Sequence, residues 1–318
     1  MELGSEAKRG PLPLRIYGMR YFDIEETAPY WGNTTKRLLP KFEGDKPGTR
    51  LISRSVKIFA DGTFLFEVFC LLESWPMRFP GALRSGGAAL HEPYTDNPST
   101  TGLMRISPEL LNRVVPSFLR DGWQVNIHAI GDRANGIILD TFARAQRELG
   151  VDIRSLRPRI EHVQIIAKED NHRLGELGVI ASIQPTHAYV PIGPERVKNL
   201  YAFRNILAGN ARITLGSDFP VEEVNPLAGF FAAITRVAKD GSSPHGPDGW
   251  FPDQKLTRLE ALRGMTIDPA YASFMEKNLG SLEAGKRADF VILSKDIMVV
   301  PPQDILKTTV RATVIDGQ

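Results

Sequence analysis

Short apolar runs rich in β-branched residues alternate along this chain with longer segments of helical periodicity. Near-continuous apolar runs of this kind are typical of parallel strands that are buried on both faces. The expected strands span residues 14–19, 56–60, 125–130, 159–165, 179–183 and 213–216. Regular alternation of strands with helices predicts a parallel sheet, either a TIM barrel or a doubly wound sheet.

Helix boundaries are marked by residues with known capping preferences. Ser107, followed by proline, is a good N-cap for a helix that carries apolar residues on one face. A second helical face begins near Ala134 and ends at Gly150, a typical C-terminal residue. Thr257 and Glu260 have the spacing of a capping box, which predicts a further helix start.

The C-terminal tail has a different pattern. Residues 280–289 are polar and rich in turn formers, and they precede two expected strands at 290–293 and 308–315. We expect these strands to form a small β-layer beside the main sheet. No GxGxxG or P-loop motif follows an expected strand, which disfavours a nucleotide-binding doubly wound fold.

The composition is that of an ordinary globular protein. The chain has 318 residues, of which 42% are apolar and 24% charged, so a disordered chain, a collagen and a coiled coil are excluded. The 39 basic and 37 acidic residues leave a net charge of +2, which predicts no general attraction to nucleic acid or to an anionic membrane.

Targeting signals and disulfides are not expected. The sequence begins with polar residues and no apolar signal segment, and no stretch reaches the ~18 apolar residues that span a bilayer. The single cysteine, Cys70, permits no intramolecular disulfide and fits a reducing compartment. A cytoplasmic location is therefore expected.

Polar side chains occupy positions in or just after four expected strands. They are Lys57 in VKIFADG, His128 in NIHAIGD, His162 in IEHVQ and Asp218 in LGSDFP. Active sites of barrels gather at the carboxyl ends of strands. Two histidines and an aspartate from separate strands suit Zn²⁺ or a similar ion, which would lower the pKa of a bound water.

Each residue also has a structural interpretation. A single strand histidine is more often hydrogen-bonded within the fold than bound to metal. Lys57 can extend to solvent from a strand end, and Asp218 can cap a helix. His187, in QPTHAY after another expected strand, is placed either near a substrate carbonyl oxygen or in a loop hydrogen-bonded to backbone.

Taken together, the motifs resemble the amidohydrolase superfamily, in particular its amidohydrolase 3 (YtcJ-like) branch. The similarity covers roughly residues 11–317 apart from one interruption. The segments that carry it, in order, are VKIFADG, GGAALHEPYTDNPSTTGLM, GWQVNIHAIGDRAN, RIEHVQII, GVIASIQPTHA, YAFRNILAGNARITLGSDFPVEEVNPLAGFFAAITR and GSLEAGKRADFVILSKD.

This resemblance implies a metal-dependent (β/α)₈ barrel with a small β-sandwich, and hydrolysis of non-peptide C–N bonds in amides, formamides or cyclic amides. By similarity, His128 and His162 are metal ligands from the fifth and sixth barrel strands. Asp218 is the eighth-strand aspartate, which binds metal and shuttles the proton. Lys57 takes the fourth-strand ligand position, which requires N-carboxylation because an ammonium cannot bind a cation. His187 assists oxyanion stabilisation, and zinc is the expected metal, as one or two ions.

The chain departs from the family pattern in two places. The family's first strand ends in an HxH pair of metal ligands, and no His-x-His occurs here. Counting from residues 14–19 gives about six of eight strands, so the expected fold is a partial TIM barrel (1–278) with a remnant of the sandwich (279–318), from a truncated or partial gene product. Residues 63–81 form an apolar insertion, either an active-site lid, a membrane-touching helix or a translated intron.

Two functions therefore stay open. The first is a metal-dependent hydrolase of C–N bonds that acts on a small amide-type substrate, with neither nucleic acid nor membrane as a partner. The second is a catalytically impaired remnant that keeps part of the fold without the HxH ligands. A related phosphotriesterase-like or deaminase activity is a third option, which the GSDFP and HAIGD contexts fit less well.

Overall fold

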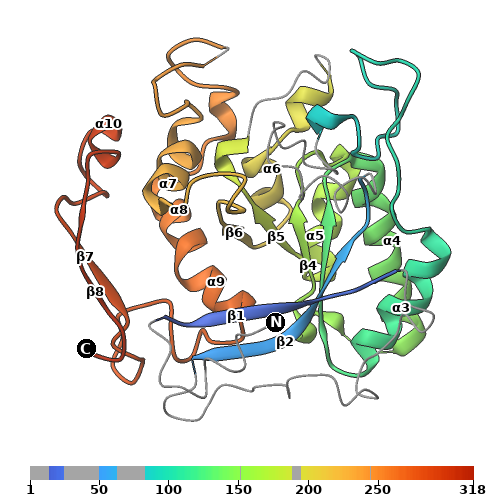
Figure 1. Cartoon of the computed structure of the whole chain (residues 1–318), viewed down its shortest axis with the longest axis horizontal. Helices are drawn as coiled ribbons and strands as arrows, with labels where there is room; N and C mark the ends of the chain where they lie inside the picture. The colour runs from blue at the N-terminus through green and yellow to red at the C-terminus, as the bar shows by residue number, and fades with distance from the viewer. Residues whose placement is uncertain (1–13, 25–49, 63–82, 151, 188–194, 244) are drawn as a thin grey trace, which may run out of the picture.

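The computed structural model describes residues 14–24, 50–62, 83–150, 152–187, 195–243 and 245–318. Its main feature is a curved sheet of six strands that are hydrogen-bonded in chain order, each parallel to its neighbour (Figure 1). This half-barrel confirms the predicted α/β architecture with six barrel strands. The strands are β1 (Ile16–Tyr21), β2 (Leu51–Phe59), β3 (Gln124–Ala129), β4 (Arg159–His162), β5 (Ile180–Ile183) and β6 (Ile213–Leu215). The expected insertion at 63–81 lies outside the described residues.

Helices follow most of the strands, and their ends are capped largely as the sequence predicts. The side chain of Ser107 accepts a hydrogen bond from Leu110 N, and Thr257 and Glu260 form a reciprocal capping box. Gly150 ends its helix in the left-handed conformation. The helices are α3 (Pro108–Arg120), α4 (Asp132–Leu149), α5 (Asn171–Leu177), α6 (Phe203–Ala208), α7 (Pro226–Thr235), α8 (Arg258–Met265), α9 (Ile267–Ala272) and α10 (Pro302–Ile305). Short 3-10 helices span Leu83–Ser85, Ile153–Leu156, Lys168–Asp170, Pro185–His187, Arg196–Asn199 and Pro252–Gln254.

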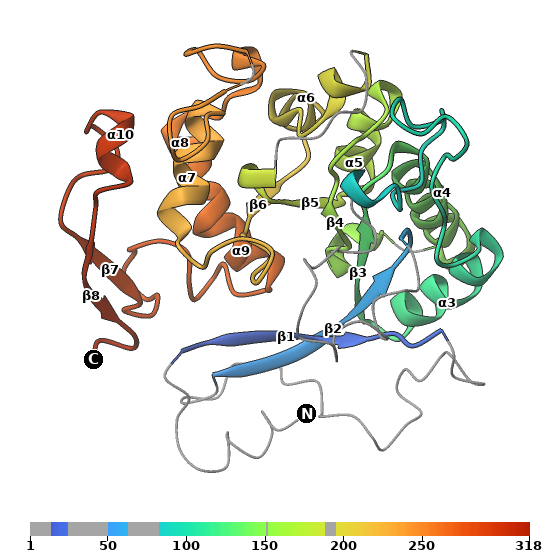
Figure 2. The same ribbon diagram turned by 45° about the horizontal axis from the view of Figure 1, so that its top comes forward.

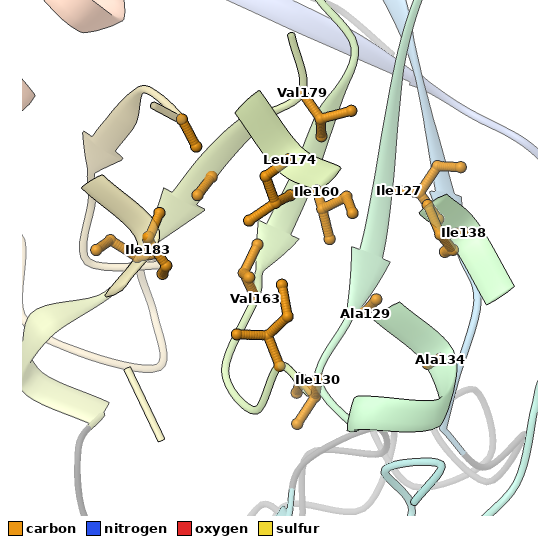
Figure 3. Packing of buried hydrophobic residues seen from close by; sticks show 14 of the residues in the cluster. Ile127, Ala129, Ile130, Ala134, Ile138, Ile160, Val163, Leu174, Val179 and Ile183 are labelled. Atoms are coloured by element: carbon orange, nitrogen blue, oxygen red, sulfur yellow. The ribbon is translucent and has the colours of Figure 1, made fainter. Parts of the chain in front are cut away.

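The core lies between the sheet and these helices. In Figure 3, Ile127 and Ala129 of β3 lie beside Ile138 and Ala134 of α4, and all four are fully buried. Because side chains alternate along a strand, the residues between them, including His128, point to the opposite face of the sheet. One face of β3 therefore packs in the hydrophobic core, and the other carries polar groups.

Strand β4 is shorter than the sequence predicts. It ends at His162 instead of continuing to Ile165, because His162 and Val163 adopt φ angles of 79° and 44°. Non-glycine residues rarely adopt this conformation, and it is found mainly where the surrounding structure imposes it, often at functional sites. The turn redirects the chain just after the histidine.

A separate two-stranded antiparallel sheet, β7 (Phe290–Leu293) and β8 (Val310–Val314), confirms the predicted C-terminal β-layer. It lies at one end of the molecule, where helices α7, α8 and α9 separate it from β3–β6 and the beginning of β1 extends toward it (Figures 1 and 2). Arg15, just before β1, pairs with Asp289 at 2.6 Å and also with Asp316, so charged side chains link the first described strand to the C-terminal sheet.

Candidate metal centre and catalytic site

The structure brings His128 and His162 together. His128 is the fifth residue of β3, and His162 is the last residue of the adjacent β4. Their rings meet edge to face, with centroids 4.5 Å apart, and both residues are buried. In the strand register His128 pairs with Glu161 and Ala129 with His162, so the two histidines lie at neighbouring positions of adjacent strands.

Burial makes His162 a neutral imidazole, although its hydrogen bond to Gln184 acts in the opposite direction. Its Nδ1 lies 2.8 Å from Oε1 of Gln184, which also accepts a hydrogen bond from the Tyr201 hydroxyl at 3.1 Å. Burial is the main cause that lowers the pKa of His162 well below its usual range, and the neighbouring His128 acts in the same direction. The ring is therefore able to donate a lone pair at neutral pH.

His128 faces a buried carboxylate. Its Nε2 lies 3.3 Å from Oδ1 of Asp61, close enough for an ion pair but without hydrogen-bond geometry. Neither ring nitrogen of His128 has a hydrogen-bond partner among the described residues. Buried polar atoms without partners are uncommon, and the binding of an ion at such atoms is one accepted explanation. The chemistry of this imidazole pair thus fits two ligand positions of a divalent metal.

Asp61 is a residue that the sequence interpretation did not single out. Its carboxylate is fully buried and accepts backbone hydrogen bonds from Ala89 N at 3.1 Å, Ile130 N at 3.2 Å and Gly131 N at 2.9 Å. It therefore joins the segment after β2 to the turn between β3 and α4. The motif VKIFADG contains this aspartate, but only its lysine was interpreted.

Lys57 lies on β2, next to the acidic residues of the site. The residue is half-buried, and its ammonium lies 4.9 Å from the centre of the Phe59 ring. Burial lowers the pKa of Lys57, whereas the charges of Glu161 and Asp218 act in the opposite direction. A lowered pKa increases the share of neutral amine, the form that reacts with carbon dioxide.

Glu161 is a second buried acid that the sequence interpretation missed. It lies on β4 beside Arg159, with a separation of 2.9 Å between Arg159 Nη2 and Glu161 Oε1. Burial alone would raise the pKa of Glu161, but the charges of Arg159 and Lys57 hold it below its usual value. Strand alternation places the Glu161 side chain on one face of β4 with that of Arg159.

Asp218 follows β6 with a φ of 55°, on the exposed rim of the site. Desolvation of its carboxyl raises the pKa, and the charges of Lys57 and His128 oppose that shift. The alternative role as a helix N-cap is wrong, because Asn225 caps α7 and accepts a hydrogen bond from Leu227 N at 3.1 Å. Asp218 is thus free of a capping role and interacts electrostatically with the predicted ligands.

His187 ends a 3-10 helix that follows β5, and it is half-buried. Its Nε2 has no hydrogen-bond partner, and burial lowers its pKa to about 4. A charge on His187 would lower the pKa of His162 further. A neutral His187 can donate a hydrogen bond to a ligand without carrying a charge.

The buried histidines predict an acid-sensitive fold. The unfolded chain takes up a proton near pH 6.5, whereas folded His187 does so only near pH 4, so its contribution to stability is complete above pH 6.5 and is lost as the pH falls. Between pH 7 and pH 5 we expect His187 to reduce the free energy of unfolding by about 1–2 kcal/mol. Urea denaturation at both pH values measures this loss. His187→Gln should reduce it, and the exposed His172→Gln should not; an equal loss in all three proteins would contradict the prediction.

A small cavity adjoins this group of residues. It has a volume of about 80 Å³ and lies beside the carboxyl end of β6, next to Asp218 instead of above the two histidines. Its walls combine apolar side chains, including Leu215, Val224 and Met265, with the polar residues Glu222 and Lys239.

The described residues do not form a complete metal-binding cluster. No group of three or more His, Cys, Asp or Glu side chains in the described ranges comes together closely enough to hold a metal ion. His128 and His162 lie together as a pair, and Lys57 and Asp218 interact electrostatically with them. Nor does any helix in this part of the chain have the length and apolarity required to cross a bilayer.

Sequence comparison finds curated relatives of this chain. The chain is 38% identical over 246 residues to the protein LONG AFTER FAR-RED 3 of Arabidopsis thaliana, a match that covers 75% of this chain and 41% of that protein. It is 29% identical over 245 residues to the putative amidohydrolase YtcJ of Bacillus subtilis, covering 75% and 45% of the two chains. The chain thus spans less than half the length of these curated relatives.

A solved structure has the same fold. An uncharacterized metal-dependent hydrolase from Pyrococcus horikoshii superposes with a TM-score of 0.65 and 30% sequence identity, covering 81% of this chain and 47% of that one. The sequence profile of the amidohydrolase family matches residues 6–318, nearly the whole sequence. The chain belongs to the amidohydrolase family.

Proposed function

We propose that this chain carries the metal-binding and proton-transfer half of a hydrolase that cleaves non-peptide C–N bonds in a small amide, formamide or cyclic amide. The observation that carries the proposal is the pair of buried histidines, with ring centroids 4.5 Å apart and no hydrogen-bond partner for either nitrogen of His128. Membership of the amidohydrolase family supports the reaction class.

In this proposal, His128 and His162 hold a divalent metal, with zinc the preferred ion because imidazole nitrogens suit it. A bound zinc ion would supply an acidified water and polarise the substrate carbonyl. Lys57 would add a ligand oxygen after N-carboxylation, for which its lowered pKa is favourable because the neutral amine reacts.

Proton transfer is assigned to Asp218. Its carboxylate would take a proton from the attacking water and return it to the leaving nitrogen, and a raised pKa makes the carboxylate a better base for the first of these transfers. His187 would donate a hydrogen bond to the carbonyl oxygen, where negative charge develops; its lowered pKa and an Nε2 that has no partner among the described residues support this role.

Zinc-dependent hydrolysis tests the proposal. The purified 318-residue chain, loaded with zinc, is incubated separately with a simple amide, an N-substituted formamide and a cyclic amide, and the released amine is quantified. We expect hydrolysis of at least one of them, loss of the activity with a chelator and recovery with added zinc. A zinc-loaded chain that cleaves none of the three contradicts the proposal.

One observation favours a second candidate, a family member with impaired catalysis. The described residues hold no group of three or more His, Cys, Asp or Glu side chains that could bind a metal ion. The sequence also has no His-x-His pair. On this alternative, zinc binds weakly through two imidazoles and no amide is cleaved. Micromolar or tighter zinc binding together with turnover distinguishes the hydrolase from this remnant.

A further inference from the structure

We propose that Gln184 is a positioning residue that fixes the tautomer of His162, so that Nδ1 carries the proton and Nε2 keeps a free lone pair directed to the site. This inference deepens the proposed function and rests on it for the use of that lone pair. The hydrogen-bonded arrangement itself is independent of any bound metal.

The geometry around Gln184 carries the argument. Its Oε1 lies 2.8 Å from His162 Nδ1 and 3.1 Å from the Tyr201 hydroxyl, and all three residues are buried. An amide oxygen accepts hydrogen bonds and cannot donate them. His162 must therefore donate from Nδ1, and a neutral ring with its single proton there has a lone pair on Nε2.

The opposite orientation of the Gln184 amide would reverse this conclusion, so the amide has to be assigned from its neighbours. Gln184 Nε2 lies 3.5 Å from the carbonyl oxygen of Ser182, which is only an acceptor. Exchanging the two amide atoms would place one carbonyl oxygen against another and leave the amide nitrogen between Nδ1 and the phenol. The Ser182 carbonyl thus favours the orientation in which Oε1 faces His162.

Tyr201 holds the amide oxygen from the other side and is itself fixed through its backbone. Its N–H donates to the Gln164 carbonyl at 2.8 Å, and its own carbonyl accepts from Nη1 of Arg236, also at 2.8 Å. Arg236 is buried at the end of α7, where its guanidinium also bonds to the carbonyl of Trp250. This series of contacts runs from α7 to His162 and limits rotation of the Gln184 side chain.

A fixed tautomer matters because only one ring nitrogen of neutral histidine can bind a cation. Residues that donate to or accept from the other nitrogen orient the ring, and their loss typically costs about 10–100-fold in metal affinity. The Gln184 contact therefore prepares His162 before any ligand arrives. The QPTHA motif contains both Gln184 and His187, but the sequence alone gives no reason to connect the glutamine with a histidine 22 positions earlier.

Nitrogen-15 NMR of the full chain, free of metal, tests the inference directly, because it distinguishes protonated from unprotonated ring nitrogens. The unaltered protein should show His162 as the Nδ1–H tautomer. Gln184→Leu should give a mixture of tautomers and bind zinc about 10–100-fold more weakly. Gln184→Glu keeps an acceptor oxygen in the same position and should restore the Nδ1–H form.

Gln124→Leu is the matched control, because Gln124 is also a buried glutamine but bonds to the carbonyls of Arg157 and Ala272 instead. It should leave the His162 signals unchanged. An Nε2–H tautomer in the unaltered protein overturns the inference, as does an unchanged Nδ1–H tautomer in folded Gln184→Leu. If the tautomer responds as expected but the unaltered chain binds no zinc, the positioning role is supported and the proposed function fails.

Discussion

Replacing Asp61 by alanine is expected to lower the free energy of unfolding by about 3–5 kcal/mol. The substitution removes a buried carboxylate that accepts hydrogen bonds from Ala89 N, Ile130 N and Gly131 N. Each backbone donor that loses its partner in a dry environment costs roughly 1–3 kcal/mol. His128 also loses an acidic group that lies within ion-pair distance of its Nε2, at 3.3 Å. Urea denaturation followed by circular dichroism measures the change.

Two further variants separate the loss of these hydrogen bonds from a general effect of losing an aspartate. Asp61→Asn keeps the shape and one acceptor oxygen, so we expect a smaller loss of roughly 1–3 kcal/mol. Asp248→Ala, at an exposed position, should be nearly neutral. Stability of Asp61→Ala within about 1 kcal/mol of the unaltered chain would show that these contacts do not hold the segments together.

Replacing His162 by alanine is expected to lower zinc affinity and the rate of amide hydrolysis by at least about 100-fold. The reason is that His162 contributes a neutral imidazole held by Gln184, next to His128. Removing a direct metal ligand should lower zinc affinity more than removing a residue that only orients a ligand. Isothermal titration with zinc and initial rates at saturating zinc measure the two effects.

His172→Ala is the control for this variant, because His172 lies on the exposed side of α5 and pairs only loosely with Glu176, at 3.9 Å. It should retain the zinc affinity and rate of the unaltered chain. Thermal unfolding of His162→Ala shows whether the protein is still folded at the assay temperature. A folded His162→Ala variant with unchanged zinc affinity would remove His162 from the metal site.

Much of the fold follows from local sequence patterns. Apolar runs indicate all six parallel strands, and Ser107, Thr257 and Gly150 mark helix ends because capping depends on neighbouring residues alone. The end of β4 was placed three residues too late, since RIEHVQI is apolar enough to continue as a strand. The turn after His162 is imposed by tertiary contacts that leave no local signal.

Some residues of the site can likewise be predicted from the sequence, and others cannot. His128 and His162 can be expected to meet because parallel strands bring their carboxyl ends to one edge of the sheet. Asp61 and Gln184 could not be assigned, because their roles depend on backbone donors and a ring nitrogen that are distant in sequence. Asp218 was compatible with helix capping until the structure showed that α7 begins at Pro226 behind its own cap, Asn225.

The zinc content of the unaltered chain tests the central claim most directly. The protein is dialysed against zinc, passed through a desalting column and analysed by plasma mass spectrometry alongside a His128→Ala/His162→Ala double variant. The account predicts at least one zinc ion per unaltered chain and none retained by the folded double variant. No zinc in the unaltered chain, or equal zinc in both proteins, would contradict a metal centre built on these two histidines.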